Sequence, residues 1–337
     1  MKNYLDLSDL PNDRLEAVLA LARDLERHPI NDTLRGRTIA LLFMNPSLRT
    51  LASMQAGIAQ LGGSSVVIQP GAGSWKLEMR DGAVMDGDAV EHVREAIPVL
   101  AEYADALGVR CFAENKDLQV DLDDAVIKKM AGLCPKPFIN LESAVSHPCQ
   151  ALADWKTLDD LEIPRRGGKF VLSWAYHPKA LPYAVPASAL RMAARRGMRV
   201  TVLRPEGFDL PVQIMDDARA IASRCGGSIA TTAKREEALD GAHVLYAKSW
   251  SAPSHYGRPA EEAALRAPLR DWCIAESWFA PAAANAKFMH CLPVRRNVKV
   301  ADEVLDGPRS VVIKEAGNRM HAQKALMVEM LAGGSAR

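Results

Sequence analysis

The sequence predicts an α/β protein of two doubly wound domains, each with a parallel sheet covered by helices on both faces. Its 337 residues suffice for about two domains, each large enough for its own core. With 48% hydrophobic and 25% charged residues, the composition is that of a globular protein. Short apolar runs alternate with helix-like stretches along the chain, as in parallel sheets whose strands are buried on both faces.

The first domain is expected over residues 1–150. Its apolar runs end at turn residues, and the helix-like stretches between them have helical spacing of apolar side chains. Residues 71–88 are rich in Gly and Asp without periodicity, which predicts a long functional loop. Strands are expected at 38–43, 65–68, 106–110 and 138–140, and helices at about 12–27, 50–61, 90–103 and 122–133.

The second domain is expected over residues 151–317, after a helix that runs from Pro148 to about Leu161. Residues 318–337 are expected to contain a C-terminal helix, at 318–331, that packs back across both domains and returns to the first. Strands of the second sheet are expected at 169–174, 199–203, 228–232, 243–247, 288–290 and 310–314.

Charge and hydropathy exclude several classes of protein. Lys and Arg number 42 against 41 Asp and Glu, so the net charge of +1 argues against a nucleic-acid binder. No apolar run reaches the ~20 residues that span a bilayer, so no membrane association is expected. The N-terminus turns polar and acidic within a few residues, unlike a signal peptide. The six cysteines are far apart, as free thiols in a reducing compartment would be, which favours a cytoplasmic protein.

Ligands of doubly wound folds bind at the carboxyl ends of the strands, and polar residues gather at the expected ends here. Ser47-Leu48-Arg49-Thr50 opens a helix, which suits an anion held on backbone N–H groups, although a simple helix cap explains it equally well. Arg110 follows another strand, and Arg319 stands at the start of the terminal helix. Several arginines in one cleft indicate a multiply charged oxyanion such as phosphate.

Other chemistries lack their signatures. Neither G-x-x-x-x-G-K-[ST] nor a strand followed by G-x-G-x-x-G occurs, which disfavours a nucleotide enzyme and a dehydrogenase. No H-E-x-x-H or metal-type Cys/His spacing occurs, so no metal is expected.

Three ordered motifs resemble the transcarbamylase family over essentially the whole chain: Ser47-Leu48-Arg49-Thr50, His147-Pro148-Cys149-Gln150 and His290-Cys291-Leu292-Pro293. The resemblance implies a carbamoyl phosphate domain, an amino-substrate domain and no metal or organic cofactor. It also implies a homotrimer, or a multiple of trimers, with active sites shared between subunits. The loop after residue 70 would then reach into the neighbour's site.

The segment Tyr246–Trp250 stands where ornithine-type members carry Ser-Met-Gly. Together with Trp75, residues 84–88 and residues 292–299, it resembles the N-acylornithine branch. The resemblance implies carbamoyl transfer from carbamoyl phosphate to the δ-amine of N2-acetyl-L-ornithine, in arginine biosynthesis. The products would be N-acetyl-L-citrulline and phosphate.

The resemblance also implies roles for individual residues. Thr50, Arg110 and His147 would face the carbonyl oxygen as an oxyanion-type cluster. The catalytic residues would be Arg110, His147, Gln150 and Cys291, with Cys291 positioning the amine rather than attacking. Carbamoyl phosphate would bind Ser47, Leu48, Arg49, Thr50, Trp75, Arg110, His147, Gln150, Leu292 and Arg319. The acylornithine would bind Glu142, Lys248, Cys291, Arg295 and Lys299, of which Lys299 can be carboxylated in this branch.

Two departures from the family pattern leave alternatives open. Val90 stands where acetyl-type members carry a glutamate that would repel a second carboxylate, so N-succinyl-L-ornithine is the alternative acceptor. Leu51 stands where the family usually carries an arginine, which removes a positive charge near the phosphate. A catalytically silent paralogue that binds carbamoyl phosphate is therefore the further alternative.

Overall fold

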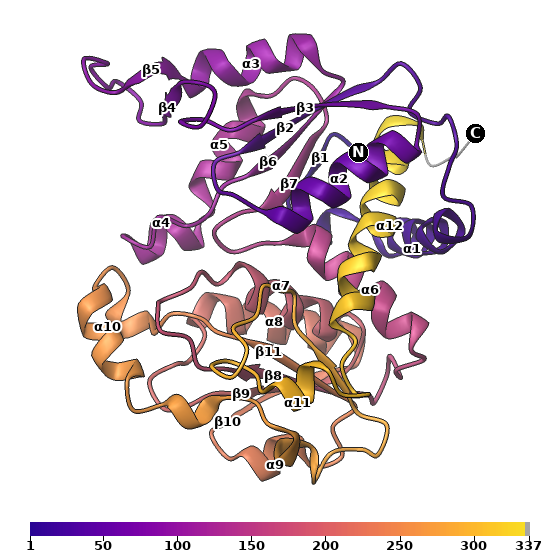
Figure 1. The fold of residues 1–337 in the computed structure, drawn as a ribbon, viewed down its shortest axis with the longest axis vertical. Coiled ribbons are helices and arrows are strands. Elements are labelled where there is room, and N and C mark those ends of the chain that lie inside the picture. Colours follow the sequence, from indigo (N-terminus) through magenta and orange to yellow (C-terminus); the bar gives the residue numbers. More distant parts are fainter. Residues whose placement is uncertain (334–337) are drawn as a thin grey trace. The chain divides into compact units, whose positions relative to one another are not determined.

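The computed structural model describes residues 1–333, which form two compact units (Figure 1). The first unit comprises Met1–Ala113, Asp123–Leu152 and the chain from Arg319 onward. The second comprises Glu114–Leu122 and Ala153–Asn318. Each unit is built on one five-stranded parallel sheet, so the predicted α/β class is confirmed.

The sheet of the first unit has the strand order β1-β7-β6-β2-β3. Its central strands are apolar and buried along their whole length, whereas β3 forms a partly exposed edge. The register pairs Phe43 with Arg110 and Arg110 with Glu142, which brings the carboxyl ends of three strands together. The strands are β1 (Asn3–Tyr4), β2 (Thr38–Phe43), β3 (Ser64–Ile68), β6 (Ala106–Arg110) and β7 (Phe138–Glu142).

Helices cover both faces of this sheet (Figure 1). Helices α3 (Val93–Tyr103) and α5 (Ala125–Leu133) pack on one face, where Ile97, Met130 and Phe138 belong to the core. Helices α1 (Asn12–Arg27), α2 (Leu48–Gln60) and α12 (Val312–Leu331) meet at the buried Lys324, whose Nζ lies 2.9 Å from Leu25 O and 2.8 Å from Gln60 Oε1.

The sheet of the second unit has the order β10-β9-β8-β11-β12. Helices α7 and α8 pack together on one side of it, and α9 lies on the other (Figure 1). The strands are β8 (Lys169–Trp174), β9 (Arg199–Leu203), β10 (Ser228–Thr232), β11 (Val244–Lys248) and β12 (Lys287–Met289). The α-helices are α4 (Leu118–Leu122), α7 (Ala184–Arg195), α8 (Val212–Cys225), α9 (Arg235–Leu239), α10 (Pro259–Arg266) and α11 (Asp302–Leu305). Single 3-10 turns are η1 (Leu7–Asp9) in the first unit and η2 (Pro253–His255), η3 (Arg270–Trp272) and η4 (Glu276–Phe279) in the second.

Two helices run from one unit into the other. The division falls between Leu152 and Ala153 in α6 (Pro148–Asp160) and between Asn318 and Arg319 in α12. The C-terminal helix thus contributes residues to both units. The two helices are joined by Asn318, whose Nδ2 donates to Thr157 Oγ1 at 2.9 Å.

The segment 71–88 is not entirely a loop, contrary to the sequence-based prediction. It contains β4 (Lys76–Glu78), which pairs in parallel with β5 (Ala89–His92) in a small separate sheet. Val90, expected in a helix, therefore lies on a strand. Helix α3 begins after His92, whose side chain accepts from Arg94 N and caps the helix.

Two further predictions were wrong. The expected strand 310–314 has one bridge, Ser310 to Phe288, and α12 begins at Val312, six residues before the helix start expected at Asn318. The β-branched run Val311–Ile313 suggested a strand, but such propensity is weak against tertiary context. The helix expected at 122–133 is divided between α4 and α5 at Asp124, which has a left-handed backbone with φ +53°.

Candidate active site

The start of α2 is built to hold an anion. Ser47 has an extended backbone, and its side chain accepts from Thr50 N at 3.2 Å, the geometry of an N-cap. The first turn carries no acidic residue, so no carboxylate competes for the positive end of the helix dipole. Arg49 and the neighbouring backbone N–H groups lie at this helix end, where phosphate groups bind in many proteins.

Arg319 of α12 reaches the same place. Its Nη2 donates to Thr50 Oγ1 at 2.7 Å, and both residues are buried. Burial lowers the pKa of Arg319 below its usual range, while Cys149 and Glu142 raise it and Arg110 and Arg49 lower it further. The three arginines are thus close enough to repel one another, as expected of a site for a multiply charged anion.

Arg110 and His147 share one carboxylate oxygen. Arg110 Nη1 donates to Glu142 Oε2, and His147 Nε2 lies 3.3 Å from the same oxygen. The Arg110 guanidinium also lies over the ring of Phe112, 4.3 Å from its centre. All three polar side chains are buried, so their directions are fixed by these contacts.

The loop from Glu142 to His147 is fixed by hydrogen bonds to Asp124 and Asp6. Asp124 accepts from Ser143 Oγ at 2.6 Å and from Ala144 N at 3.1 Å. Ser146 Oγ donates to Asp6 Oδ2 at 2.8 Å. The loop leads into α6, whose first turn carries the buried Gln150 and Cys149. Burial raises the pKa of the Cys149 thiol to about 12, so it stays protonated at neutral pH.

Basic side chains lie close together in the second unit. Lys248 ends β11, and its Nζ lies 3.6 Å from Cys291 Sγ. Lys299 is 2% exposed. Burial, and next the charge of Lys248, hold its pKa well below the usual range, with smaller contributions from Arg266 and Arg295. A group of this composition fits an anionic ligand such as a carboxylate.

His177, which sequence reasoning missed, orients Arg295. The Arg295 Nε donates to His177 Nε2 at 3.2 Å. Burial lowers the pKa of His177 to about 4, so the ring is neutral at pH 7. Since Nε2 accepts, the proton lies on Nδ1, which donates to Lys179 O at 2.9 Å. His177 comes just after β8, so the strand-end rule could have found it.

The His290–Pro293 segment turns sharply after β12. Leu292 has φ +54°, and its N–H donates to His290 Nδ1 at 2.8 Å. The His290 N–H donates to Glu315 Oε2 of α12 at 2.9 Å. Cys291 is buried between these anchors.

The structure assigns the sequence-predicted residues to three places. Trp75 and Val90 belong to the β4–β5 region of the first unit and are 67% and 57% exposed. Glu142, expected to bind the acylornithine, belongs to the first unit and pairs with Arg110. The first unit also holds Ser47, Leu48, Arg49, Thr50, Arg110, His147, Gln150 and Arg319, and the second holds Lys248, Cys291, Leu292, Arg295 and Lys299.

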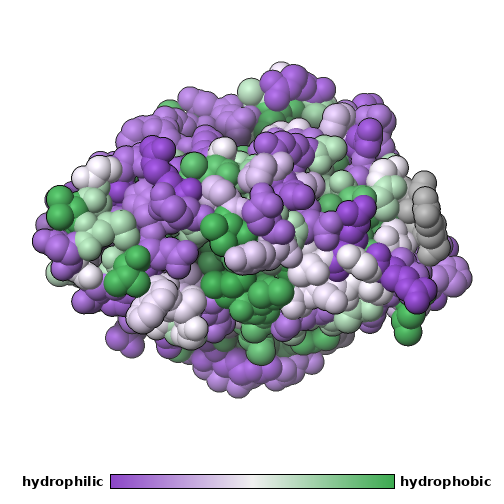
Figure 2. Space-filling model, turned by 90° about the horizontal axis from the view of Figure 1, so that it is seen from above, coloured by the Kyte–Doolittle hydropathy of each residue, from purple (hydrophilic) through white to green (hydrophobic). Residues whose placement is uncertain are grey.

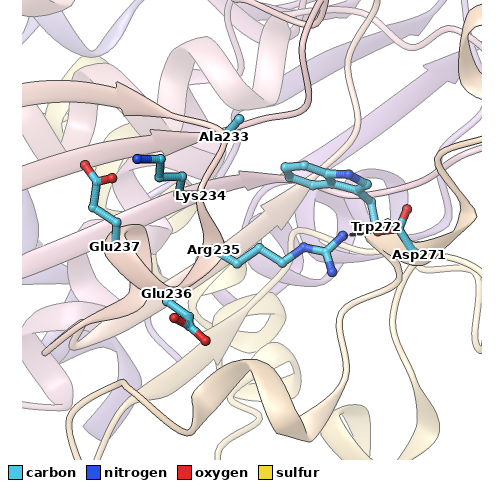
Figure 3. Close-up of a pocket in the computed structure, with 7 residues that line it drawn as sticks. All are labelled: Ala233, Lys234, Arg235, Glu236, Glu237, Asp271 and Trp272. Atoms are coloured by element: carbon cyan, nitrogen blue, oxygen red, sulfur yellow. Dashed lines mark hydrogen bonds and ion pairs between the residues drawn. The ribbon is translucent and has the colours of Figure 1, made fainter.

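A surface hollow of about 590 Å³ in the second unit lies apart from these residues (Figure 3). Arg235 extends between the rings of Trp272 and Trp278, 4.9 and 4.4 Å from their centres, and pairs with Asp271.

Within residues 1–333, no three His, Cys, Asp or Glu side chains are grouped to hold a metal ion. No helix of the same residues is long and apolar enough to cross a membrane.

Two family models match the chain. The carbamoyl-P binding domain of aspartate/ornithine carbamoyltransferase matches residues 2–160, and its Asp/Orn binding domain matches residues 184–330. The chain belongs to the aspartate/ornithine carbamoyltransferase family. The sequence-based prediction of this family, and of an enzyme, is confirmed.

Similar proteins of this family include N-acylornithine enzymes. The N-acetylornithine carbamoyltransferase of Xanthomonas campestris is 42% identical over 98% of both chains. The N-succinylornithine carbamoyltransferase of Bacteroides thetaiotaomicron is 33% identical over 99% of both. A glutamate-to-valine variant of N-acetyl-L-ornithine transcarbamylase, solved with carbamyl phosphate and N-succinyl-L-norvaline, has a TM-score of 0.94 and 42% identity. The match covers 98% of this chain and 100% of that structure's chain.

Proposed function

We propose that this carbamoyltransferase transfers the carbamoyl group of carbamoyl phosphate to the δ-amine of N2-acetyl-L-ornithine, in arginine biosynthesis. The products are N-acetyl-L-citrulline and phosphate. The observation that carries the proposal is the meeting of Arg49, Arg110 and Arg319 at the Ser47-capped start of α2. The named activity of the 42% identical Xanthomonas relative supports the acetyl acceptor.

The first unit binds carbamoyl phosphate in this proposal. The phosphate lies on Ser47, the Leu48 backbone, Arg49, Thr50 and Arg319, with Trp75 supplied by a neighbouring subunit. The proposal assigns residues 1–150 and the C-terminal segment 318–337 to carbamoyl phosphate and residues 151–317 to the acylornithine, as expected from the sequence. In the structure, Glu114–Leu122 belongs to the second unit.

Thr50, Arg110 and His147 polarise the carbonyl oxygen. Glu142 supports this role, because one carboxylate oxygen fixes the directions of both Arg110 and His147. The neutral δ-amine attacks the carbonyl carbon, and negative charge develops on the oxygen that these donors face. The tetrahedral intermediate then collapses, the C–O bond to phosphate breaks, and the proton lost by the amine is taken up by the leaving phosphate. Donors aligned in advance lower the barrier because they need not reorganise.

Gln150 and the Leu292 carbonyl hold the carbamoyl NH₂ group, and Cys291 positions the attacking amine. No covalent enzyme intermediate, metal or organic cofactor takes part in this scheme. The turn at Leu292 and its bond to His290 Nδ1 support a fixed carbonyl direction there.

The α-nitrogen of the acylornithine is neutral, so the site binds the substrate mainly through its α-carboxylate. Lys248 and Arg295 are the cations for it, with Arg295 held by His177, and Glu142 completes the site. Burial lowers the pKa of Lys299 and so favours its neutral, nucleophilic amine, which supports carboxylation by CO₂. The resulting carbamate would be an anion beside Lys248.

Self-association as a homotrimer is supported by the surface of the first unit. Among residues 1–333, 13 large hydrophobic residues are exposed and ten of them belong to this unit, including Val66 on the β3 edge, Trp75 and Val90. Figure 2 shows such hydrophobic side chains among hydrophilic ones on one face. Contiguous apolar patches of this kind would mark an interaction surface. The six free cysteines support a reducing compartment, the cytoplasm.

N-succinyl-L-ornithine is the second candidate acceptor. Val90 supports it, because a glutamate at this position would repel the succinyl carboxylate and valine does not. The solved glutamate-to-valine relative, complexed with N-succinyl-L-norvaline, agrees with this reasoning. The third candidate is a silent paralogue that binds carbamoyl phosphate without transfer, because Leu51 on α2 stands where the family usually carries an arginine.

The test is the initial rate with carbamoyl phosphate and, separately, N2-acetyl-L-ornithine, N-succinyl-L-ornithine and free L-ornithine. A preference for the acetyl compound supports the proposal, and a preference for the succinyl compound moves the function to the second candidate. Activity with free ornithine alone would contradict the branch assignment. Tight carbamoyl phosphate binding without turnover would favour the silent paralogue.

A further inference from the structure

The two helices shared by the units carry matching pairs of polar residues. On α6, Gln150 is followed one turn later by Asp154, and on α12, Glu315 precedes Arg319 by one turn. Residues four apart lie on the same side of a helix. Gln150 and Arg319 belong to the first unit, where they serve the proposed carbamoyl phosphate site. Asp154 and Glu315 belong to the second unit and have no assigned role.

Asp154 and Glu315 form a buried pair of carboxyl groups. Both are 0% exposed, and the Asp154 carboxyl lies close enough to Glu315 to act on its ionisation. Burial, and next the Asp154 carboxyl, raise the pKa of Glu315 well above its usual range. Two neighbouring carboxyl groups do not readily both ionise away from water, which favours one proton shared between them.

Glu315 also contacts the backbone of the His290–Pro293 segment, which carries the proposed substrate-binding residues Cys291 and Leu292. Glu315 Oε2 accepts from the His290 backbone N–H at 2.9 Å. His290 in turn accepts from Leu292 N through its Nδ1 at 2.8 Å. A chain of contacts therefore runs from Asp154 through Glu315 to the backbone that presents Cys291 and Leu292.

We infer that Asp154 and Glu315 are positioning residues for the carbamoyl transfer, which together fix the His290–Leu292 backbone by sharing one proton. This inference rests on the proposed function, in which Leu292 and Cys291 hold the carbamoyl NH₂ group and the amine. Neither carboxyl group touches the substrates.

A purely structural tie between α6 and α12 is the competing explanation, and the chain offers a matched control for it. Thr157 Oγ1 accepts from Asn318 Nδ2 at 2.9 Å, a second buried bond between the same two helices. Thr157→Val removes this bond with little change of shape and leaves His290 untouched. The control therefore separates a loosened helix pair from a displaced His290–Leu292 backbone.

Two substitutions of Glu315 make opposite predictions. In Glu315→Gln, the amide oxygen accepts from His290 N and the amide nitrogen donates to an ionised Asp154, so the chain of contacts survives without a proton. In Glu315→Leu, the His290 N–H loses its acceptor in a buried place, which carries a full desolvation penalty. Glu315→Asp keeps the acid but withdraws its oxygen from His290, and serves if the leucine variant fails to fold.

The experiment measures kcat, both KM values and backbone hydrogen exchange over residues 288–293 in the full-length wild type and these variants. We expect Glu315→Gln to stay within about threefold of wild-type kcat and Glu315→Leu or Glu315→Asp to lose at least about tenfold, the cost of one misplaced hydrogen bond. Exchange over 288–293 should accelerate in the leucine and aspartate variants only, and Thr157→Val should keep kcat within about twofold.

The inference is overturned if Glu315→Gln is as damaged as Glu315→Leu, if Glu315→Leu keeps wild-type kcat, or if Thr157→Val loses as much activity. A wild type that carbamoylates no acceptor would refute the proposed function instead. In that case hydrogen exchange still tests whether Glu315 anchors the His290 backbone. Unchanged exchange in both the leucine and aspartate variants would refute this anchoring.

Discussion

Arg319 Nη2 lies 2.7 Å from Thr50 Oγ1, although the two residues are 269 positions apart in the chain. The bond fixes a side chain of the C-terminal helix α12 against the first turn of α2. Both ends of the first unit's chain thus contribute to the arginine group that the proposed function assigns to phosphate.

Replacing Arg319 should weaken carbamoyl phosphate binding. A lysine keeps the charge but cannot place a planar donor on Thr50 and on an anion at once, so Arg319→Lys should raise the carbamoyl phosphate KM about tenfold or more. Steady-state kinetics checks this result. Lys324→Met on the same helix should lower thermal stability without changing that KM, and an equal rise in both variants would contradict the assignment.

His147 should matter for the chemical step more than for binding. His147→Ala removes one donor to the developing oxyanion, so kcat should fall about 10²–10³-fold, as for other oxyanion donors. The affinity for carbamoyl phosphate, measured by calorimetry, should change much less, because the phosphate contacts remain. A loss of binding with normal kcat would place His147 outside the oxyanion cluster.

His177 should tune the acceptor site alone. His177→Ala removes the acceptor that orients Arg295, so the N2-acetyl-L-ornithine KM should rise about three- to tenfold, in the range of one hydrogen bond. The carbamoyl phosphate KM should stay near the wild-type value. His177→Gln, which offers an amide oxygen to Arg295, should recover part of the loss, and no difference between the two variants would contradict the role.

The same histidine predicts a pH dependence of stability. Its pKa falls from 6.5 to about 4 on folding, so the unfolded chain binds the proton more readily. The stability contributed by neutral His177 is therefore complete above pH 6.5 and is lost as the pH falls toward 4. Urea unfolding at pH 6.5 and 4.5 should show a smaller loss in His177→Gln than in the wild type. Equal losses of stability in the two proteins would mean that other groups cause the destabilisation at acid pH.

Lys299 should react with CO₂. Burial and the charge of Lys248 lower the pKa of Lys299 well below the usual range, which favours the neutral amine that carbamate formation requires. ¹³C NMR with labelled bicarbonate should show a carbamate signal in the wild type that is absent in Lys299→Met. A signal of equal strength in both proteins would assign the carbamate to another amine.

Val90 should govern the choice of acyl group. Val90→Glu adds a carboxylate, so its rate with N-succinyl-L-ornithine should fall about tenfold relative to the rate with N2-acetyl-L-ornithine. Like charges at close range in a partly desolvated site cost at least this much. An unchanged ratio would show that another residue determines the specificity.

Much of the fold follows from local pattern. The strands β8, β9 and β10 have the boundaries expected from the sequence, because their apolar runs end at turn residues. Helix α2 begins at Leu48, two residues before the start expected at Thr50, because Ser47 caps it through a local bond. The short β4, by contrast, depends on pairing with β5 rather than on its own pattern.

The site was predictable in its residue types but not in its contacts. Motif positions nominated Arg110, Glu142 and His147, yet the shared carboxylate oxygen depends on strand register and on a loop held by Asp124. His177 and Glu315 carry no motif of their own. Their roles become visible only when Arg295 and the His290 backbone are placed beside them.

The most direct test of the account is to follow carbamoyl phosphate labelled with ¹³C at its carbonyl carbon in the presence of N2-acetyl-L-ornithine. The account predicts that the label appears in N-acetyl-L-citrulline, one equivalent for each phosphate released, and that Arg110→Met abolishes this transfer. Phosphate release without labelled N-acetyl-L-citrulline, or unchanged transfer in Arg110→Met, would contradict the account.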